Sequence, residues 1–172
     1  RRVRQRIGVV LKWAVAQGWR SDNPADAITQ ALPKQSRAKE HRKALHYNDV
    51  AGCIAAVKAS QAAPATKLAI EFLILTATRS GEARGATWDE IDVAARTWTI
   101  PGPRMKMKEE HVVPLSNRAV DILNEAKALG DGTGLVFPGT KFGRPLSDMT
   151  LSKLIKELGF NADVHGFRTS FR

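Results

Sequence analysis

The stretch PATKLAIEFLILTATR, residues 64–79, decides the fold of this chain. Proline is favoured in the first turn of a helix, so Pro64 opens a helix that we expect to run to Thr78. Its apolar side chains lie on nearly all sides, which is typical of a helix buried at the centre of a domain. Arg79 follows this helix directly and is therefore expected to be held rigidly.

The composition is that of a globular protein without a membrane span. The most apolar part of this stretch, residues 68–75, is interrupted by Glu71 and is far shorter than the roughly 20 residues that a membrane span needs. The 172 residues are 43% hydrophobic and 26% charged, which argues against disorder. Cys53, the one cysteine, permits no internal disulfide and suits a reducing cytoplasm. Because the chain starts at Arg1 with no leader segment, we expect a fragment and not a secreted precursor.

Helical periodicity continues on both sides of the buried helix. Asn48 and Ser147 are expected to cap two of the further helices, and Ser116 directly precedes a third. In the helix after Ser147, Met149 is expected to face inward with Leu151, Leu154 and Ile155. In chain order, the predicted helices outside the buried one cover residues 2–17, 24–32, 48–60, a short segment from 80, 117–129 and 148–158.

Residues 88–114 have a different pattern. Trp98 and Ile100 alternate with threonines, and Val112-Val113 follow a segment of lysine, methionine and glutamate. Alternation of this kind predicts strands, here joined by a basic hairpin. The predicted fold is therefore mostly α-helical with a small antiparallel β-sheet, of the α+β class.

Positive charge is concentrated at the front of the chain. The net charge is +10, and residues 1–44 hold eleven Lys and Arg against three acids, whereas residues 45–172 hold sixteen against fourteen. Such asymmetry is typical of a protein with a polyanionic partner, because cations that neutralise phosphates release condensed counterions. A well-solvated surface is the alternative.

The charge pattern also suggests the domain organisation. Residues 1–32 form two helices that cannot build a core alone, so we interpret them as the C-terminal part of a helical domain. Residues 33–45 lack apolar periodicity and indicate an exposed basic linker, and residues 46–172 form the second domain. The cations expected to contact this polyanion are Arg2, Arg4, Arg6, Lys12, Lys34, Arg37, Lys39, Arg42, Lys43 and Lys108.

A further motif, His165-Gly166-Phe167-Arg168, lies at the other end of the sequence. A histidine and an arginine three residues apart lie on the same face of a helix. A titratable imidazole beside a planar guanidinium suits a phosphate or carboxylate. We expect the target to be a phosphodiester.

Taken in order, these motifs resemble those of the tyrosine recombinases of the phage integrase family, most closely the integrases of prophages and genomic islands. The resemblance is carried by TATRSGE at 76–82, WDEID at 88–92, a hairpin lysine before VPLS at 113–116, and HGFR at 165–168. It covers nearly the whole chain. Residues 1–24 resemble the end of the core-DNA-binding domain, and residues 46–172 resemble a catalytic domain that is incomplete at its C-terminal end.

The resemblance implies that Arg79 is the first catalytic arginine and Arg168 the second. Two guanidinium groups can hold the non-bridging oxygens of one scissile phosphate and stabilise the charge of the transition state. His165 would assist proton transfer or hydrogen-bond the phosphate. Glu82 is interpreted as a residue that orients an arginine. The alternatives are a surface arginine paired with Glu82, and a solvated carboxylate at a helix start.

The hairpin lysine of the family matches Lys106, which precedes Pro114 by eight residues. Its implied role is to protonate the 5′ oxygen that leaves the phosphate. Lys108 lies two residues on and is expected on the same strand face, so it competes for this assignment. For either lysine, a solvated charge or a simple phosphate contact is the alternative.

The family's nucleophile is a tyrosine that lies beyond the second arginine. The single tyrosine here, Tyr47, precedes every other site residue, so we expect these 172 residues to bind DNA without recombining it. His41, His46 and His111 show no metal-ligand spacing, and neither a metal nor another cofactor is expected. The resemblance implies double-stranded DNA as partner, a homotetramer on DNA when the protein is intact, and a place at the nucleoid in the bacterial cytoplasm.

Two other functions remain open from the sequence. A remnant integrase could occupy attachment DNA and regulate without cutting it. A metal-free phosphodiesterase could use the same histidine, lysine and arginine side chains on RNA.

Overall fold

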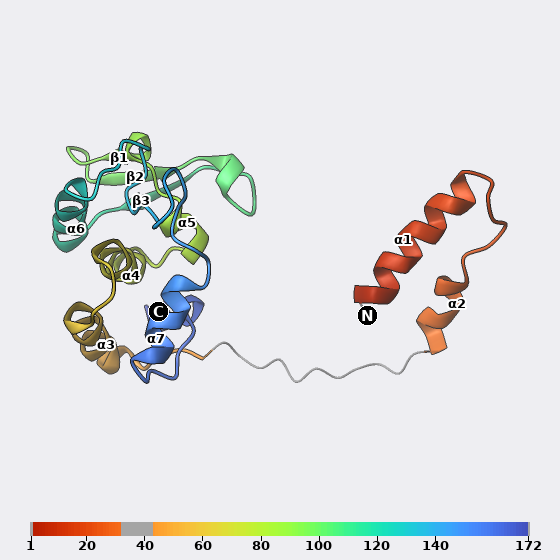
Figure 1. Cartoon of the computed structure of the whole chain (residues 1–172), viewed down its shortest axis with the longest axis horizontal. Helices are drawn as coiled ribbons and strands as arrows, with labels where there is room; N and C mark the ends of the chain where they lie inside the picture. Colours follow the sequence, from red (N-terminus) through yellow and green to blue (C-terminus); the bar gives the residue numbers. More distant parts are fainter. Residues whose placement is uncertain (1, 32–42, 172) are drawn as a thin grey trace. The chain divides into compact units, whose positions relative to one another are not determined.

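The computed structural model describes residues 2–31 and 43–171, apart from the side chains of residues 29–31. It divides into two compact units, Arg1–Glu40 and His41–Arg172. Most of the predicted linker, with Lys34, Arg37, Lys39 and Arg42, lies outside the described residues. The elements, labelled in Figure 1, are α1 (Arg2–Ala16), α2 (Pro24–Ala31), α3 (Tyr47–Ala59), α4 (Pro64–Thr76), α5 (Ser80–Arg84), η1 (Trp88–Glu90), β1 (Ile91–Asp92), β2 (Thr97–Ile100), η2 (Gly102–Arg104), β3 (His111–Pro114), α6 (Asn117–Lys127), α7 (Thr150–Glu157), η3 (Val164–Gly166) and α8 (Phe167–Ser170).

The first unit is a pair of helices that pack through small side chains. Asn23 caps α2 by accepting the N–H of Ala25 at 3.1 Å, and it donates to the carbonyl of Gly8 in α1 at 3.3 Å. Ala25 is buried, and Gly8 leaves room for it. Within the described residues, apolar side chains on another face of α1 remain exposed, namely Val3, Ile7 and Val10.

Helix α4 is the centre of the second unit, as its apolar surface predicted. It contacts α3, α5, α6 and α7 (Figure 1). The ring of Phe72 in α4 lies 5.2 Å from that of Trp98 and 5.5 Å from that of Phe137. The helix ends at Thr76, two residues earlier than predicted, because Ala77 adopts a left-handed conformation with φ 49°.

The sheet is a three-stranded antiparallel meander in the order β1-β2-β3. Trp98 pairs with Val113 and Ile100 with His111. Trp98 and Ile100 are fully buried while Thr97 and Thr99, which alternate with them, are half-buried, and this matches the predicted alternation. The predicted class, mostly α with a small antiparallel sheet, is confirmed.

Both predicted caps are wrong. Ser116, which precedes the helix predicted at 117–129, does cap α6, since its Oγ accepts the N–H of Ala119 at 3.2 Å. The cap of α3 is His46, whose Nδ1 accepts the N–H of Asn48, so the helix starts one residue before Asn48. Asparagine is a preferred N-cap residue and histidine is not, so the sequence pattern favoured Asn48 over His46.

The start of α7 is the other exception. Ser147 bonds the N–H of Met149 at 3.3 Å, so it closes a local turn, and the helix begins only at Thr150. Met149 therefore lies outside the helix and is exposed, contrary to the expectation that it faces inward. Leu151, Leu154 and Ile155 are buried as predicted.

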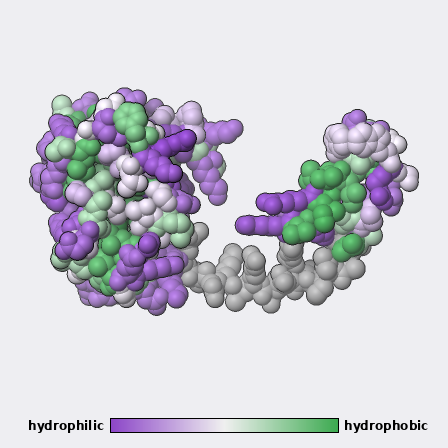
Figure 2. Space-filling view, viewed as in Figure 1, coloured by the Kyte–Doolittle hydropathy of each residue, from purple (hydrophilic) through white to green (hydrophobic). Residues whose placement is uncertain are grey.

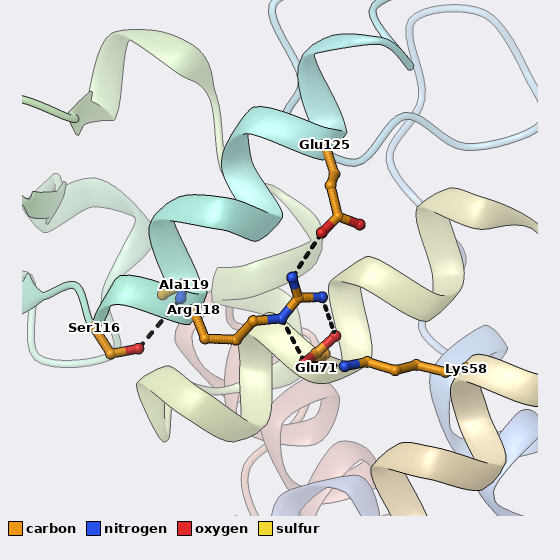
Figure 3. A network of polar contacts seen from close by, with 6 residues as sticks. All are labelled: Lys58, Glu71, Ser116, Arg118, Ala119 and Glu125. Carbon is orange, nitrogen blue, oxygen red and sulfur yellow. Dashed lines mark hydrogen bonds and ion pairs between the residues drawn. The ribbon is translucent and has the colours of Figure 1, made fainter.

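The one acidic residue of α4, Glu71, is buried at the centre of a polar network (Figure 3). Arg118 of α6 donates hydrogen bonds to both carboxylate oxygens of Glu71 at 2.9 Å, and Nζ of Lys58 in α3 pairs with Oε1 of Glu71 at 2.8 Å. Arg118 also reaches Glu125 at 2.7 Å. Burial alone would raise the pKa of Glu71, but the hydrogen bonds from Arg118 and Lys58 outweigh it and hold the pKa below its usual value. Three helices are thereby joined around one charge.

Candidate active site

Arg79 stands at the junction of α4 and α5. After the left-handed Ala77, the buried Thr78 hydrogen-bonds the hydroxyl of Thr76 at 3.0 Å. Thr76 itself donates to the carbonyl of Phe72 at 2.8 Å. Arg79 then takes an extended conformation and becomes the N-cap of α5. The backbone that carries this side chain is therefore fixed to the end of the central helix.

Glu82 holds Arg79 in two ways. Its Oε2 accepts the backbone N–H of Arg79 at 2.7 Å, and its Oε1 accepts Nη1 at 2.5 Å. The carboxylate is 6% exposed, whereas the arginine side chain is 38% exposed. Within residues 2–31 and 43–171 no other acceptor bonds this guanidinium. Its remaining N–H groups can thus reach an oxyanion outside the protein.

The base of the hairpin is attached to α5 by a residue that the sequence did not single out, Arg104. Its Nη2 donates to the backbone carbonyl of Glu82 at 2.6 Å. Its Nη1 contacts both carboxylate oxygens of Glu90. Lys106 lies two residues beyond Arg104 and is exposed. The contacts of Glu82 and Arg104 therefore attach both Arg79 and the base of the Lys106 loop to α5, Arg79 as its N-cap and Arg104 beside its C-cap, Gly85.

Lys106 and Lys108 were expected on a strand, but the structure places neither of them on one. Residues 105–110 form a loop between η2 and β3, and Lys108 has a left-handed φ of 58°. The N–H of Lys108 bonds the carbonyl of Met105 at 3.1 Å, which closes a turn around Lys106. The two lysines are thus not related by strand alternation, and both are exposed.

His165 and Arg168 are carried by a short helical segment at the end of the described chain. His165 lies in the 3-10 turn η3 and Arg168 in α8, so the single helix face that was expected is divided between two elements. His165 is exposed and Arg168 is half-buried. Phe167, between them, is buried and fixes the segment to the core.

This segment packs against the entry to the second unit. The N–H of Asp163 donates to the carbonyl of Lys43 at 2.8 Å, and the hydroxyl of Ser170 donates to the carbonyl of Leu45. A Cβ on Gly166 would lie 2.1 Å from the Lys43 carbonyl oxygen, so only glycine fits there. The network that joins Arg79 to the hairpin does not include Arg168, whose position is set by this packing instead.

The structure also shows a basic turn that was not predicted, because its residues have no helical or strand periodicity. The turn at 141–144 exposes Lys141 and Arg144 and, between them, Phe142, which is 81% exposed. Arg84, the last residue of α5, donates to the carbonyl of Leu146 just after the turn. A cavity of about 400 Å³ opens beside it, lined in part by Thr66, Lys141, Arg144, Ser147 and Thr150.

The expected DNA-binding cations of the first unit are mostly accessible. Arg2, Arg6 and Lys12 are exposed, while Arg4 is half-buried. Lys12 pairs with Asp26 at 3.6 Å, both side chains being largely exposed. Lys43, in the second unit, is exposed. Figure 2 shows hydrophilic side chains over much of the visible surface of that unit, with several projecting from it.

The residues that the structure describes offer neither a metal-binding cluster nor a helix that could span a membrane. No three His, Cys, Asp or Glu side chains there are grouped so that they could hold a metal ion. No helix there has both the length and the apolar character to cross a bilayer.

Comparison with known proteins places this arrangement in a class. Residues 43–171 match the model of the phage integrase family, and the chain belongs to that family. It is 32% identical to the integrase of Enterobacteria phage P4 over 188 residues, which cover 99% of this chain and 42% of that protein. It is 34% identical to the prophage integrase IntZ of Escherichia coli K12 over 175 residues, with coverages of 99% and 42%. The chain thus spans less than half the length of these relatives.

Solved structures support the fold. A dimer of lambda integrase bound to a COC′ core site matches with a TM-score of 0.68 and 20% identity, over 98% of this chain and 63% of that one. The Tn1549 transposon integrase in complex with circular intermediate DNA matches with a TM-score of 0.64 and 13% identity, over 99% and 63% of the two chains.

Proposed function

We propose that the intact protein is a site-specific DNA recombinase that cuts and rejoins DNA through a covalent phosphotyrosine intermediate. The observation that carries the proposal is the fixed and open guanidinium of Arg79, bound by Glu82 on one edge and accessible on the other. A rigid cation with unused donors can stabilise the charge of a phosphoryl transition state without reorganisation. Membership of the phage integrase family supports DNA as the substrate.

The chemistry proposed for the remaining residues follows from their groups. Arg168 would hold a second non-bridging oxygen of the same phosphate. The tyrosine oxygen would bond to phosphorus as the bond to the 5′ oxygen breaks. Lys106 would give its proton to that oxygen, and His165 would assist removal of the phenol proton. The bond energy is kept in the phosphotyrosine, so rejoining would need no nucleotide cofactor.

We propose double-stranded DNA as the partner. The surplus of cations in residues 1–44 and the turn of Lys141 and Arg144 would contact DNA phosphates. One solved relative is a lambda integrase tetramer bound to a Holliday junction, with a TM-score of 0.67 and 20% identity, which supports a tetramer for the intact protein. Its place of action would be the nucleoid in the bacterial cytoplasm.

A second candidate function is DNA binding without cleavage. It is favoured by Tyr47, the one tyrosine of the chain, which lies exposed at the start of α3 and packs on the ring of His46 at 4.5 Å. Tyr47 precedes every proposed site residue, and none of its described contacts is with Arg79 or Lys106. Such a protein would occupy attachment sites and block their use.

The deciding experiment uses a protein that continues through a tyrosine after Arg168, mixed with nicked duplex DNA from the end of its element. A recombinase yields a covalent adduct on a denaturing gel. Arg79→Ala should abolish the adduct while most of the DNA affinity remains, because affinity is spread over many phosphate contacts. Salt-sensitive binding without any adduct would favour the second function, and parallel loss of both binding and adduct in Arg79→Ala would contradict the role of Arg79.

A further inference from the structure

We propose that Arg104 is a positioning residue that sets where Lys106 stands relative to Arg79. The inference rests on the proposed function, which places Lys106 and Arg79 on the same phosphate. Arg104 would touch neither DNA nor the reacting atoms. It would act by fixing the base of the loop that carries the proton donor.

The contacts of Arg104 lead to two fixed points. One is the Glu90 carboxylate, which is 6% exposed and also accepts the indole N–H of the buried Trp98 at 3.0 Å. The other is the backbone carbonyl of Glu82 at 2.6 Å. A guanidinium that binds a carboxylate and a carbonyl at once is held in direction as well as distance.

Glu82 connects this anchor to the first arginine. Its carboxylate binds Arg79 through both backbone and side chain, while its carbonyl binds Arg104. Lys106 lies two residues beyond Arg104, and adjacent Cα atoms are about 3.8 Å apart, so its backbone lies within about 7.6 Å of that of Arg104. A shift of Arg104 therefore moves the ammonium group of Lys106 with respect to Arg79.

The loop between the anchor and the strand is compact, which lets it transmit such a shift. A Cβ on Gly102 would lie 2.5 Å from the carbonyl oxygen of Lys108, so the two sides of the loop are in contact. Met105 is half-buried against the core, but apolar contact does not fix orientation. Arg104 supplies the directional attachment.

Gly85 provides a way to displace the guanidinium without removing it. An alanine Cβ at this position would lie 3.0 Å from Nη2 of Arg104, and the backbone φ of −98° accepts alanine. Gly81, one turn earlier on the same helix, has nothing within 4 Å of its Cβ position. Gly85→Ala and Gly81→Ala are thus a matched pair, and only the first should disturb Arg104.

The test compares cleavage of ordinary DNA with cleavage of DNA in which sulfur replaces the bridging 5′ oxygen. It uses the protein that carries the nucleophilic tyrosine. With sulfur the P–S bond breaks and a thiolate leaves, which needs no proton because a thiol has a pKa near 8.5. Lys106→Ala should lose about 10²- to 10⁴-fold in rate on ordinary DNA and recover on the sulfur substrate.

Arg104→Ala and Gly85→Ala should each lose about 10- to 100-fold on ordinary DNA, recover on the sulfur substrate and keep their DNA affinity, whereas Gly81→Ala should match the parent. An equal loss on both substrates, or no loss, would overturn the inference while Lys106 keeps its role. Failure of the sulfur substrate to restore Lys106→Ala would remove the role of Lys106 and the inference with it. If Arg104→Ala does not fold, Gly85→Ala decides.

Discussion

Gly166 lies against the backbone of Lys43, where a side chain has no room. Gly166→Ala should move the segment of His165 and Arg168 away from residues 43–45 and destabilise the second unit by about 1–3 kcal/mol, as overpacking does. Urea unfolding of the chain measures this change. The bond from the Asp163 N–H to Lys43, at 2.8 Å, should weaken with it, and faster amide exchange at Asp163 would report that directly.

Gly52, in the middle of α3, is the control for this substitution. Its Cβ position has nothing within 4 Å, so Gly52→Ala should leave stability unchanged or raise it by about 0.5–1 kcal/mol through helix propensity. Equal stability of Gly166→Ala and Gly52→Ala would show that the close approach to Lys43 does not constrain the site.

At the residue scale, sequence could indicate which side chains matter but not what holds them. The motif around His165 predicted a site, yet the reason for its glycine is a contact with a segment more than a hundred residues earlier. Arg104 stands two residues before a lysine that the resemblance did select. Its role depends on a carbonyl at the end of another helix, which has no signature in the sequence.

Among the elements, α4 combines the most apolar surface of the chain with a buried carboxylate. Glu71→Gln should destabilise the second unit by about 1–3 kcal/mol, because Arg118 and Lys58 lose the charge that pairs them. Glu125→Gln makes the same change at an exposed partner of Arg118 and should cost less than about 0.5 kcal/mol. Urea midpoints at pH 7 compare the two, and equal values would show that burial of Glu71 adds nothing.

The same network predicts a pH dependence. The pKa of Glu71 is lower in the folded than in the unfolded chain, so its contribution is fully present above the unfolded value of about 4.3. It is lost as the pH falls through the lower, folded pKa. The stability gap between the parent and Glu71→Gln should therefore stay constant from pH 7 to about 5 and narrow at more acidic pH.

The elements themselves were largely predictable, because the period of apolar residues identifies a helix or strand wherever one face is buried. This held for α4, α6 and β2. It failed at ends governed by local polar contacts, such as the start of α7, where Ser147 closes a turn instead of capping the helix. The hairpin was expected to carry its lysines on a strand, but the left-handed Lys108 forms a loop that no alternation pattern encodes.

For the whole molecule, the distribution of cations predicts how DNA binding responds to salt. Each lost phosphate contact should lower the slope of log K against log salt by about 0.9. Replacing Arg2 and Arg6 together by glutamine, or Lys141 and Arg144 together, should therefore reduce the slope by about 1.8 in each case.

Lys127→Gln is the control. It removes an exposed charge on α6, at the side of the second unit away from the hairpin (Figure 1), and should leave the slope unchanged. Fluorescence titrations of a labelled duplex from 50 to 200 mM salt measure these slopes. If Lys127→Gln lowers the slope as much per removed charge as the two double variants do, DNA affinity depends only on the net charge of the protein and the proposed contact surfaces are wrong. If the effect is confined to the two pairs, each unit contacts DNA phosphates through its own basic surface.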